Sequence, residues 1–233
     1  MAKAELRTPF FVVNPKSYLY GEEAMKLALC ADQLAEKYDV DILFTAQFVD
    51  LAAIRKNTKH LLICAQTMDS LKPGKGMGHI LPEALKDAGV CATFLNHAEN
   101  PKTFSELVKC IKRAAELDIL TIVCADNVDD AAAIAQLKPD VIVCEQTSLI
   151  GTGKTADASY MEATNKAVKS VSPATKTLQA AGISTPDDVR KALRNGADGT
   201  GGTSGIVCAK DPCATLTAMI QALDEVRSER RCM

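Results

Sequence analysis

Short apolar runs rich in β-branched residues recur along the chain, and each is followed by a longer segment with helical spacing. This alternation is typical of parallel βα units. The last run is the weakest, because most of its residues are glycine and glycine weakens strands. Eight strands are predicted, at residues 10–14, 41–46, 61–66, 91–96, 121–125, 141–145, 176–182 and 199–205.

The segments between the runs carry apolar residues on one helical face, which predicts helices that bury one side. Two helix starts are marked, one by Pro82 and one by Thr185, a predicted cap that precedes Pro186 and two aspartates. The repeating positions are Ala24, Leu27, Ala28, Ala31, Leu34, Ala35 and Tyr38 in one segment, Phe104, Leu107, Val108 and Ile111 in a second, and Leu216, Met219, Leu223 and Val226 in the last.

The predicted strands are continuously apolar rather than alternating, so the sheet that they form must be covered on both faces. A closed barrel and a doubly wound open sheet both meet this condition. Eight βα units favour closure, and the 233 residues match the size at which such barrels form one domain. No proline-rich or low-complexity linker interrupts the series. We therefore predict a single (β/α)8 barrel domain over residues 1–233.

Charge and composition narrow the expected partners and location. The 27 basic and 29 acidic residues are spread along the chain and leave a net charge of −2, so nucleic acid is not an expected partner. No apolar stretch approaches the ~20 residues of a membrane span, and the N-terminus lacks an export signal. Nine cysteines, without a CxxC pair, favour a reduced, cytoplasmic protein. Cys64, Cys91, Cys124 and Cys144 lie in apolar runs and are expected to be buried free thiols.

Polar residues end or follow several of the apolar runs, where a βα barrel carries its reactive groups. Asn14 and Lys16 follow the first run, His97 and Glu99 follow the fourth, and Glu145 ends the sixth. A carboxylate base with a neutral imidazole and an ammonium suits proton abstraction beside a carbonyl. Glycine-rich segments at the last three runs suit a phosphate held by backbone N–H groups.

Structural explanations stay open for the same side chains: a surface charge for Lys16, a core residue for His97 and a helix cap for Glu145. His60 and His79 are interpreted as structural, since neither ends an apolar run in a polar cluster. The chain has no zinc-type Cys/His spacing, no GxGxxG in its first βα unit and no GxxxxGK[ST] motif. Neither a metal nor another cofactor is therefore expected.

Four segments carry a family resemblance. They are VVNPKSY at 12–18, the stretch 78–100 that ends in LNHAEN, CEQTSLIGTGK at 144–154, and AGISTPDDVRKAL at 181–193 together with TSGIVCAKDP at 203–212. Their order and spacing resemble the triosephosphate isomerase family, most closely its short archaeal form, over almost the full length. The resemblance implies a TIM barrel that isomerises a small sugar phosphate without a cofactor.

In that family, a glutamate base and a neutral histidine act under a closing loop. The resemblance implies that Glu145 shuttles the proton, that His97 is the neutral electrophile and that Lys16 is the cationic substrate-binding group. It gives Asn14 and Glu99 supporting roles. The backbone groups that it implies for phosphate binding belong to Ile150, Gly151, Gly182, Thr203 and Ser204.

The resemblance also implies a homodimer or homotetramer in which the loop from Thr67 to His79 docks beside a neighbour's site. The chain departs from the family at three places: Gln146–Ser148 occupy a lid hinge where proline is common, Pro15 stands where an aromatic or aliphatic residue is usual, and Ala98 replaces a serine. These departures lie beside the carbon end of the expected site.

Three functional hypotheses follow. The chain interconverts dihydroxyacetone phosphate and glyceraldehyde 3-phosphate, or isomerises a related ketose phosphate such as a tetrulose phosphate, or is a non-catalytic sugar-phosphate-binding paralogue. Lys16, His97 and Glu145 occur together, and phosphate binding alone needs none of them. This set argues against the non-catalytic alternative and does not separate the first two.

Overall fold

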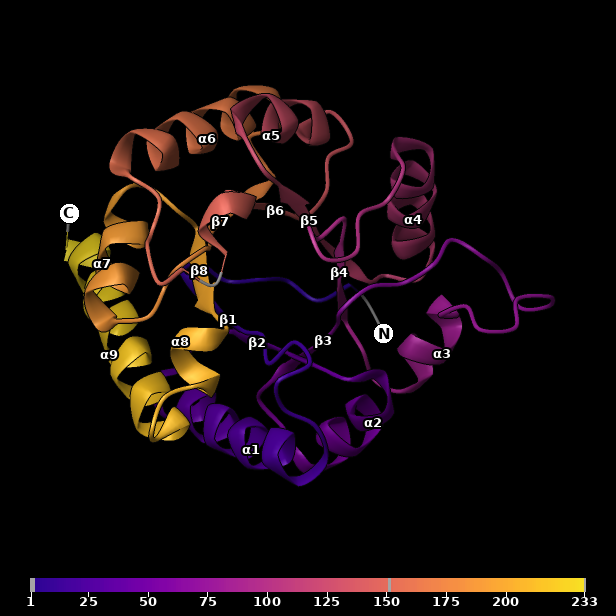
Figure 1. The fold of residues 1–233 in the computed structure, drawn as a ribbon, viewed down its shortest axis with the longest axis horizontal. Coiled ribbons are helices and arrows are strands. Elements are labelled where there is room, and N and C mark those ends of the chain that lie inside the picture. The colour runs from indigo at the N-terminus through magenta and orange to yellow at the C-terminus, as the bar shows by residue number, and fades with distance from the viewer. Residues whose placement is uncertain (1–2, 151, 233) are drawn as a thin grey trace.

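The computed structural model describes residues 3–150 and 152–232. Within them, parallel strands pair in chain order and the last strand closes onto the first, so the sheet is a barrel (Figure 1). The prediction of a (β/α)8 TIM barrel is confirmed. The strands are β1 (Phe10–Val13), β2 (Ile42–Ala46), β3 (Leu62–Ala65), β4 (Ala92–Leu95), β5 (Leu120–Ala125), β6 (Val141–Cys144), β7 (Lys176–Gln179) and β8 (Gly199–Gly202).

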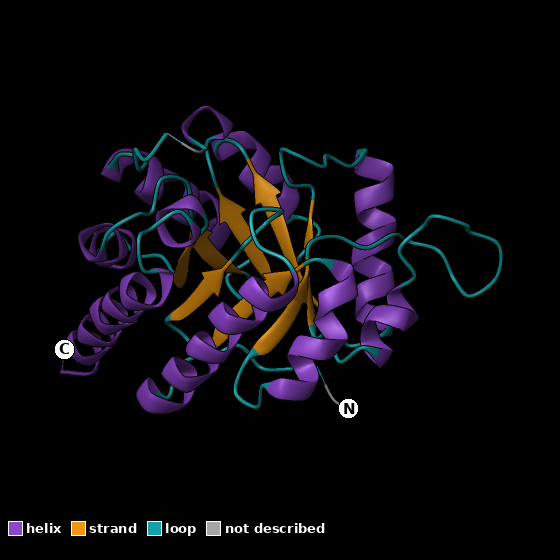
Figure 2. Cartoon of the chain, turned by 60° about the horizontal axis from the view of Figure 1, so that its bottom comes forward, coloured by secondary structure: helices purple, strands orange, loops and turns teal. Residues whose placement is uncertain are grey.

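Helices surround the barrel and cover its outer face (Figure 2). The start signals are confirmed, since Pro82 and Pro186 stand in first turns and Thr185 forms a capping box with Asp188. The helices are α1 (Gly21–Tyr38), α2 (Phe48–Asn57), α3 (Pro82–Asp87), α4 (Phe104–Glu116), α5 (Val128–Ala135), α6 (Ala158–Val171), α7 (Pro186–Arg194), α8 (Ser204–Val207) and α9 (Pro212–Cys232), with a 3-10 helix η1 (Thr147–Leu149).

Several strands end before the apolar run that predicted them. β1 stops before Asn14 and β6 before Glu145, while β7 and β8 each stop three residues early. These last residues leave the sheet at the carboxyl ends of the strands, where most of them form loops and residues 204–205 begin α8. This is the face where such barrels carry their chemistry. The residues that were wrongly predicted as strand are therefore largely those that line the candidate site.

The glycines of β8 have a steric cause. A Cβ atom built on Gly199 would lie 2.5 Å from the ring of Phe10, and one on Gly201 would lie 2.7 Å from the Cβ of Val12. Phe10 and Val12 are buried inside the barrel. The large side chains of β1 thus fill the space beside β8. Gly199 and Gly201, which made this strand hard to recognise, are needed because larger residues would clash with β1.

One helical position was predicted wrongly. Phe104 was expected on the buried face of its helix, but 64% of it is exposed. It is the first residue of α4, and burial begins one turn later, at Leu107, and continues at Cys110 and Ala114. The predicted face is thus buried along the body of the helix, whereas the first turn is exposed at Phe104 and Ser105.

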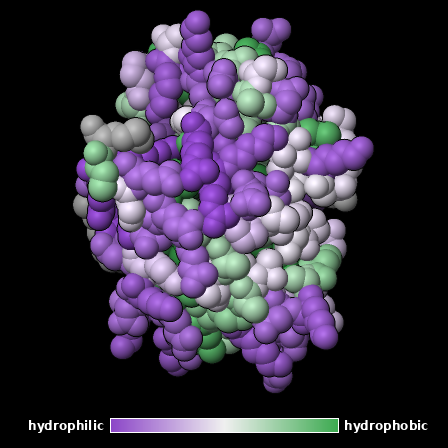
Figure 3. All heavy atoms as spheres, turned by 90° about the vertical axis from the view of Figure 1, so that its left-hand side faces the viewer, coloured by the Kyte–Doolittle hydropathy of each residue, from purple (hydrophilic) through white to green (hydrophobic). Residues whose placement is uncertain are grey.

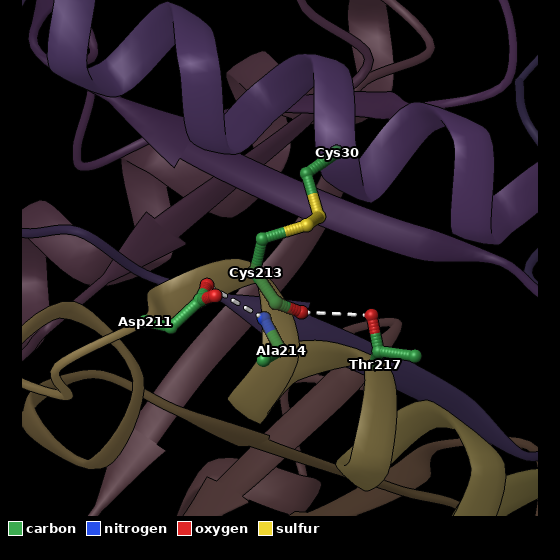
Figure 4. The surroundings of a disulfide bond; sticks show 5 residues. All are labelled: Cys30, Asp211, Cys213, Ala214 and Thr217. Carbon is green, nitrogen blue, oxygen red and sulfur yellow. Dashed lines mark hydrogen bonds between the residues drawn. A yellow bond between two sulfur atoms is a disulfide. The ribbon is translucent and has the colours of Figure 1, made fainter.

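The prediction that all cysteines are reduced is wrong for one pair. Cys30 in α1 and Cys213 in the first turn of α9 form a disulfide (Figure 4), with their Cα atoms 6.1 Å apart and a sequence separation of 183. The two helices become neighbours only when the barrel closes, because β8 pairs with β1. No local pattern could have indicated this bond.

The four thiols predicted from their apolar runs are free. Cys64, Cys124 and Cys144 are buried and Cys91 is half-buried. Burial raises the pKa of Cys144 to about 12, so the thiol stays protonated at neutral pH. The expectation of buried free thiols therefore holds for Cys64, Cys124 and Cys144 and only in part for Cys91.

The outer face over α7 and α9 is largely hydrophilic (Figure 3). Ion pairs join the two helices there: Arg190 to Glu225 and Arg194 to Glu229, each with a nitrogen–oxygen distance of 2.7 Å. These pairs are partly exposed, and pairs of this kind contribute about 0–1 kcal/mol each. Among the helices of the described residues, none combines the length and the apolar character that crossing a bilayer requires.

Candidate active site

A cavity of about 250 Å³ lies at the carboxyl ends of the strands, near the barrel axis. The structure brings together at this cavity every predicted site residue that it describes. Gly151, the remaining predicted phosphate-binding residue, lies outside the described residues. The predicted residues that line the cavity are Asn14, Lys16, His97, Glu99, Glu145, Ile150, Gly182, Thr203 and Ser204.

Lys16 is held in an uncommon backbone conformation. Its φ of 48° lies in the left-handed region, which costs energy for a residue with a side chain. Two side-chain amides stabilise this turn by donating to the Lys16 carbonyl, Gln47 Nε2 at 3.1 Å and Gln66 Nε2 at 2.8 Å. The Lys16 backbone N–H donates to Asn14 Oδ1 at 3.1 Å. The loop after β1 is therefore fixed from both sides.

Gln47, Gln66 and Thr45 are not among the predicted site residues. Gln47 and Gln66 directly follow β2 and β3, the same position as that of Asn14 after β1, so a polar residue at the end of an apolar run is a signal that marks them as well. Thr45 lies inside β2 and donates from its hydroxyl to Asn14 Oδ1 at 2.6 Å. A threonine within an apolar strand carries no sequence signal for such a role.

The charges of Lys16 and Glu99 are paired, and His97 lies next to them. Lys16 Nζ is 2.7 Å from Glu99 Oε1, and the Glu99 backbone N–H donates to His97 Nδ1 at 3.1 Å. Because Nδ1 accepts, the proton of a neutral imidazole is on Nε2. Burial lowers the pKa of His97, and the charge of Lys16 lowers it further. The arrangement therefore holds His97 as a neutral donor.

Glu145 directly follows β6 and points toward His97. Its side chain is 15% exposed, its Oε2 lies 3.7 Å from His97 Nε2, and its Oε1 accepts from the Ala181 backbone N–H at 3.0 Å. Burial raises the pKa of Glu145, while the charge of Lys16 and the Ala181 hydrogen bond oppose this shift. A carboxylate with a raised pKa is a stronger base, which suits it to removing a proton from carbon.

The other end of the cavity is built from backbone. Gly182 has a φ of +69°, and a Cβ on it would lie 2.1 Å from the Lys154 carbonyl oxygen, so only glycine fits. The backbone N–H groups of Gly182 and Ser204 donate to no acceptor among the described residues. The free N–H groups of Gly182, in the loop after β7, and of Ser204, the first residue of α8, line one cavity and can hold a phosphate.

A segment that we call the lid, residues 146–150 and 152–156, borders the cavity through Ile150. Gln146 takes the place of the proline that is common in the family, and its φ is −65° with ψ of 114°. Proline prefers the same φ. The substitution therefore leaves the backbone shape of the hinge as a proline would set it and removes only the restriction on leaving that shape.

The two histidines interpreted as structural do not line the cavity. His60 Nε2 lies 3.5 Å from Glu36 Oε1, and His79 Nδ1 lies 3.1 Å from Asp69 Oδ2. In the parts of the chain that the structure describes, no cluster of three or more His, Cys, Asp or Glu side chains has an arrangement that could hold a metal ion.

Comparison with known proteins identifies related sequences. The family model for triosephosphate isomerase matches residues 9–222. A triosephosphate isomerase from Methanothermus fervidus is 36% identical over 217 residues, which are 91% of this chain and 97% of that protein. The triosephosphate isomerase from Methanocaldococcus jannaschii is 38% identical over 86% of this chain and 93% of that protein. The one from Methanopyrus kandleri is 36% identical over 94% of this chain and 100% of that protein.

Proposed function

Because the chain belongs to the triosephosphate isomerase family, we propose that it interconverts dihydroxyacetone phosphate and glyceraldehyde 3-phosphate, a step of glycolysis and gluconeogenesis. One observation supports this most strongly: Lys16, His97 and Glu145 converge on a single cavity of about 250 Å³, a space suited to a small phosphorylated sugar. The buried carboxylate, the neutral imidazole and the ammonium are the groups that an enediolate mechanism needs.

The geometry supports the following sequence of steps. The substrate phosphate binds backbone N–H groups at Gly182 and Ser204, which places the adjacent carbons near Glu145. Its carboxylate removes a proton from C1, the C–H electron pair forms the C1–C2 double bond, and the carbonyl electrons move onto the C2 oxygen. His97 Nε2–H and the charge of Lys16 stabilise that oxygen. The proton on the C1 oxygen then moves to the C2 oxygen through His97 Nε2. As the C1 oxygen becomes the aldehyde carbonyl, the electrons of the double bond take the proton back from Glu145 at C2, which completes the isomerisation.

A tetrulose phosphate is the second candidate substrate, and one observation favours it. A second cavity, of about 220 Å³, borders the first and shares Asn14, Lys16, His97 and Glu99 with it. This space could accept an additional carbon beyond the reacting pair. No side chain of the described residues occupies this second cavity.

A comparison of the two substrates tests the proposal. In a coupled assay on the purified protein, kcat/KM for the triose phosphate is expected to exceed that for a tetrulose phosphate by at least ~10-fold, since one carbon group is worth about 10- to 200-fold in a fitted pocket. The reverse order would assign the tetrulose phosphate as substrate. Phosphate binding without turnover of either would support the non-catalytic alternative.

The assembly is proposed to be a homodimer or homotetramer. The segment between β3 and α3 projects away from the barrel (Figures 1 and 2), and Met77 within it is fully exposed. In the proposed assembly, the loop from Thr67 to His79 docks beside the site of a second copy, next to the second cavity. A monomeric mass by light scattering would contradict this.

The cytoplasmic location stays a prediction from sequence, and the Cys30–Cys213 disulfide counts against a reducing compartment.

The raised pKa of Glu145 predicts the pH dependence. A base acts only when ionised, so activity is lost as pH falls through its pKa, and burial places that pKa above the ordinary 4.5. The acid limb of kcat/KM is therefore expected to have its midpoint above 4.5. The pKa of His97 is lowered from 6.5, so its imidazole is mostly neutral at pH 6.5 and above.

The measurement is a kcat/KM profile from pH 4 to pH 9, with competitive inhibition by inorganic phosphate measured in parallel. The inhibition series separates ionisation of the phosphate, with a second pKa of about 6 in a phosphate ester, from ionisation of the enzyme. An acid limb at or below the ordinary glutamate pKa would exclude Glu145 as the base in its buried position.

A further inference from the structure

Lys191 lies on α7, and its side chain forms hydrogen bonds with the carboxyl-terminal end of the lid. Its Nζ donates to the Ala156 carbonyl at 2.9 Å and to Thr155 Oγ1 at 3.2 Å. We propose that Lys191 is a positioning residue for the isomerisation, which anchors this end of the lid so that the lid can cover the substrate. The proposal rests on the proposed function, because it assigns a role within that reaction.

The opposite end of the lid is anchored by a different side chain. Asp126, which follows β5, accepts from the Thr147 backbone N–H at 2.6 Å through Oδ1. The Asp126 carbonyl in turn accepts from the Tyr160 hydroxyl at 2.9 Å. The hydrogen bond from Thr147 lowers the pKa of Asp126, which keeps this acceptor ionised at neutral pH. The lid is thus a short segment between two charge-assisted contacts.

The end that Lys191 binds lies directly on the phosphate-binding part of the cavity. Ala156 is buried, and the Lys154 carbonyl oxygen is so close to Gly182 that no side chain fits between them. A displacement of residues 154–156 would therefore change the wall of the cavity at the Gly182 loop. Lys191 does not line the cavity, so its effect must pass through the backbone of the lid.

Helix α7 is a rigid support for this contact. It starts at the capping box of Thr185 and Asp188, immediately after the Gly182 loop, so Lys191 stands one turn inside the helix that leaves the phosphate end. The same helix therefore fixes two walls of the cavity, the Gly182 loop at its start and the lid through Lys191. Holding reacting groups to within a fraction of an ångström is what makes positioning contacts matter for rate.

The test is Lys191→Met, which keeps the aliphatic stem of the side chain and removes its donor. We expect kcat to fall about ten- to a hundredfold, the range for misplacement of a site by a distant change. Inhibition by 2-phosphoglycolate, which needs the closed lid, is expected to weaken by a similar factor. Inhibition by inorganic phosphate, which needs only the loop N–H groups, is expected to change less than about twofold. Lys191→Arg keeps a charged donor and is expected to restore most of kcat.

Lys169→Met is the matched control, because Lys169 Nζ also donates to a backbone carbonyl, that of Thr175 at 2.9 Å, but far from the lid. It is expected to lose stability without a change in kcat. Equal kinetics of Lys191→Met and wild type, with a lowered melting temperature alone, would overturn the proposal. If Lys191→Met does not fold, Thr155→Val removes part of the same contact from the lid side, and unchanged inhibition by 2-phosphoglycolate in that variant would overturn it too.

The outcomes separate this proposal from the function on which it rests. Absence of triose phosphate turnover in the wild-type protein contradicts the proposed function alone. Hydrogen exchange of lid amides with and without 2-phosphoglycolate still tests the anchor, since ligand-induced protection at residues 152–156 should be smaller in Lys191→Met than in wild type.

Discussion

Glu145→Gln is expected to lower kcat by at least ~10²-fold while inhibition by inorganic phosphate stays within about twofold of wild type. The amide has the shape of the carboxylate, so the hydrogen bond from Ala181 and the packing beside His97 are kept, but it cannot accept a proton. The loss therefore falls on the chemical step and leaves phosphate binding in place. Steady-state kinetics with a phosphate inhibition series measures both quantities.

Glu162→Gln is the matched control, since Glu162 is an exposed glutamate on α6 that does not line the cavity. It is expected to behave as wild type. Wild-type turnover by Glu145→Gln would instead show that the base has been assigned wrongly. The structure does not support the helix-cap alternative for Glu145, because its carboxylate accepts from the backbone N–H of Ala181, just after the neighbouring strand β7, rather than from the first turn of η1.

Loss of the Cys30–Cys213 disulfide is expected to have the largest effect on stability. A bond that closes a loop of 183 residues restricts the unfolded chain strongly, and removing such a bond typically costs about 2–5 kcal/mol. For a chain of this size that corresponds to a fall in melting temperature of roughly 5–15 °C. Thermal melts of wild type with and without dithiothreitol, and of Cys213→Ser, measure the effect.

Cys208→Ser provides the control, since Cys208 is exposed and free. It is expected to melt like wild type and to keep the response to dithiothreitol, whereas Cys213→Ser is expected to lose that response. Of the nine cysteines, two form the disulfide and seven are free, so unfolded protein should show seven reactive thiols before reduction and nine after it. Nine thiols before reduction would show that the bond is absent from the protein as isolated.

The fold and the members of the candidate site were within reach of the sequence because both are encoded in short segments. A β-strand is marked by a run of four to six apolar residues, as in Leu120–Ala125, and the residue that ends the run is marked by its polarity. The barrel places all such ends on one face. Lys16, His97 and Glu145 could therefore be grouped before any distance between them was known.

The hydrogen-bond partners, burial and pKa shifts of those residues depend on the tertiary structure. The raised pKa of Glu145 depends on burial, and the turn at Lys16 depends on the side-chain amides of Gln47 and Gln66, which follow β2 and β3. These effects come from segments tens of residues away, and neither composition nor periodicity reports them. The tautomer of His97 depends on a nearer contact, the backbone N–H of Glu99, whose direction only the folded loop fixes. The same holds for Lys191, whose lid contact has no marker in the sequence around it.

The order of elements, the closed parallel barrel and the polar side chains at its carboxyl-terminal face could be predicted from the chain, because they follow from local periodicity and from the fixed geometry of βα units. Only the folded protein shows that Cys30 bonds to Cys213, that Phe10 fills the space beside Gly199, and that Phe104 at the start of α4 is exposed. Each of these depends on which surfaces the closing barrel brings together, and a local pattern cannot encode a neighbour that lies far away in the chain.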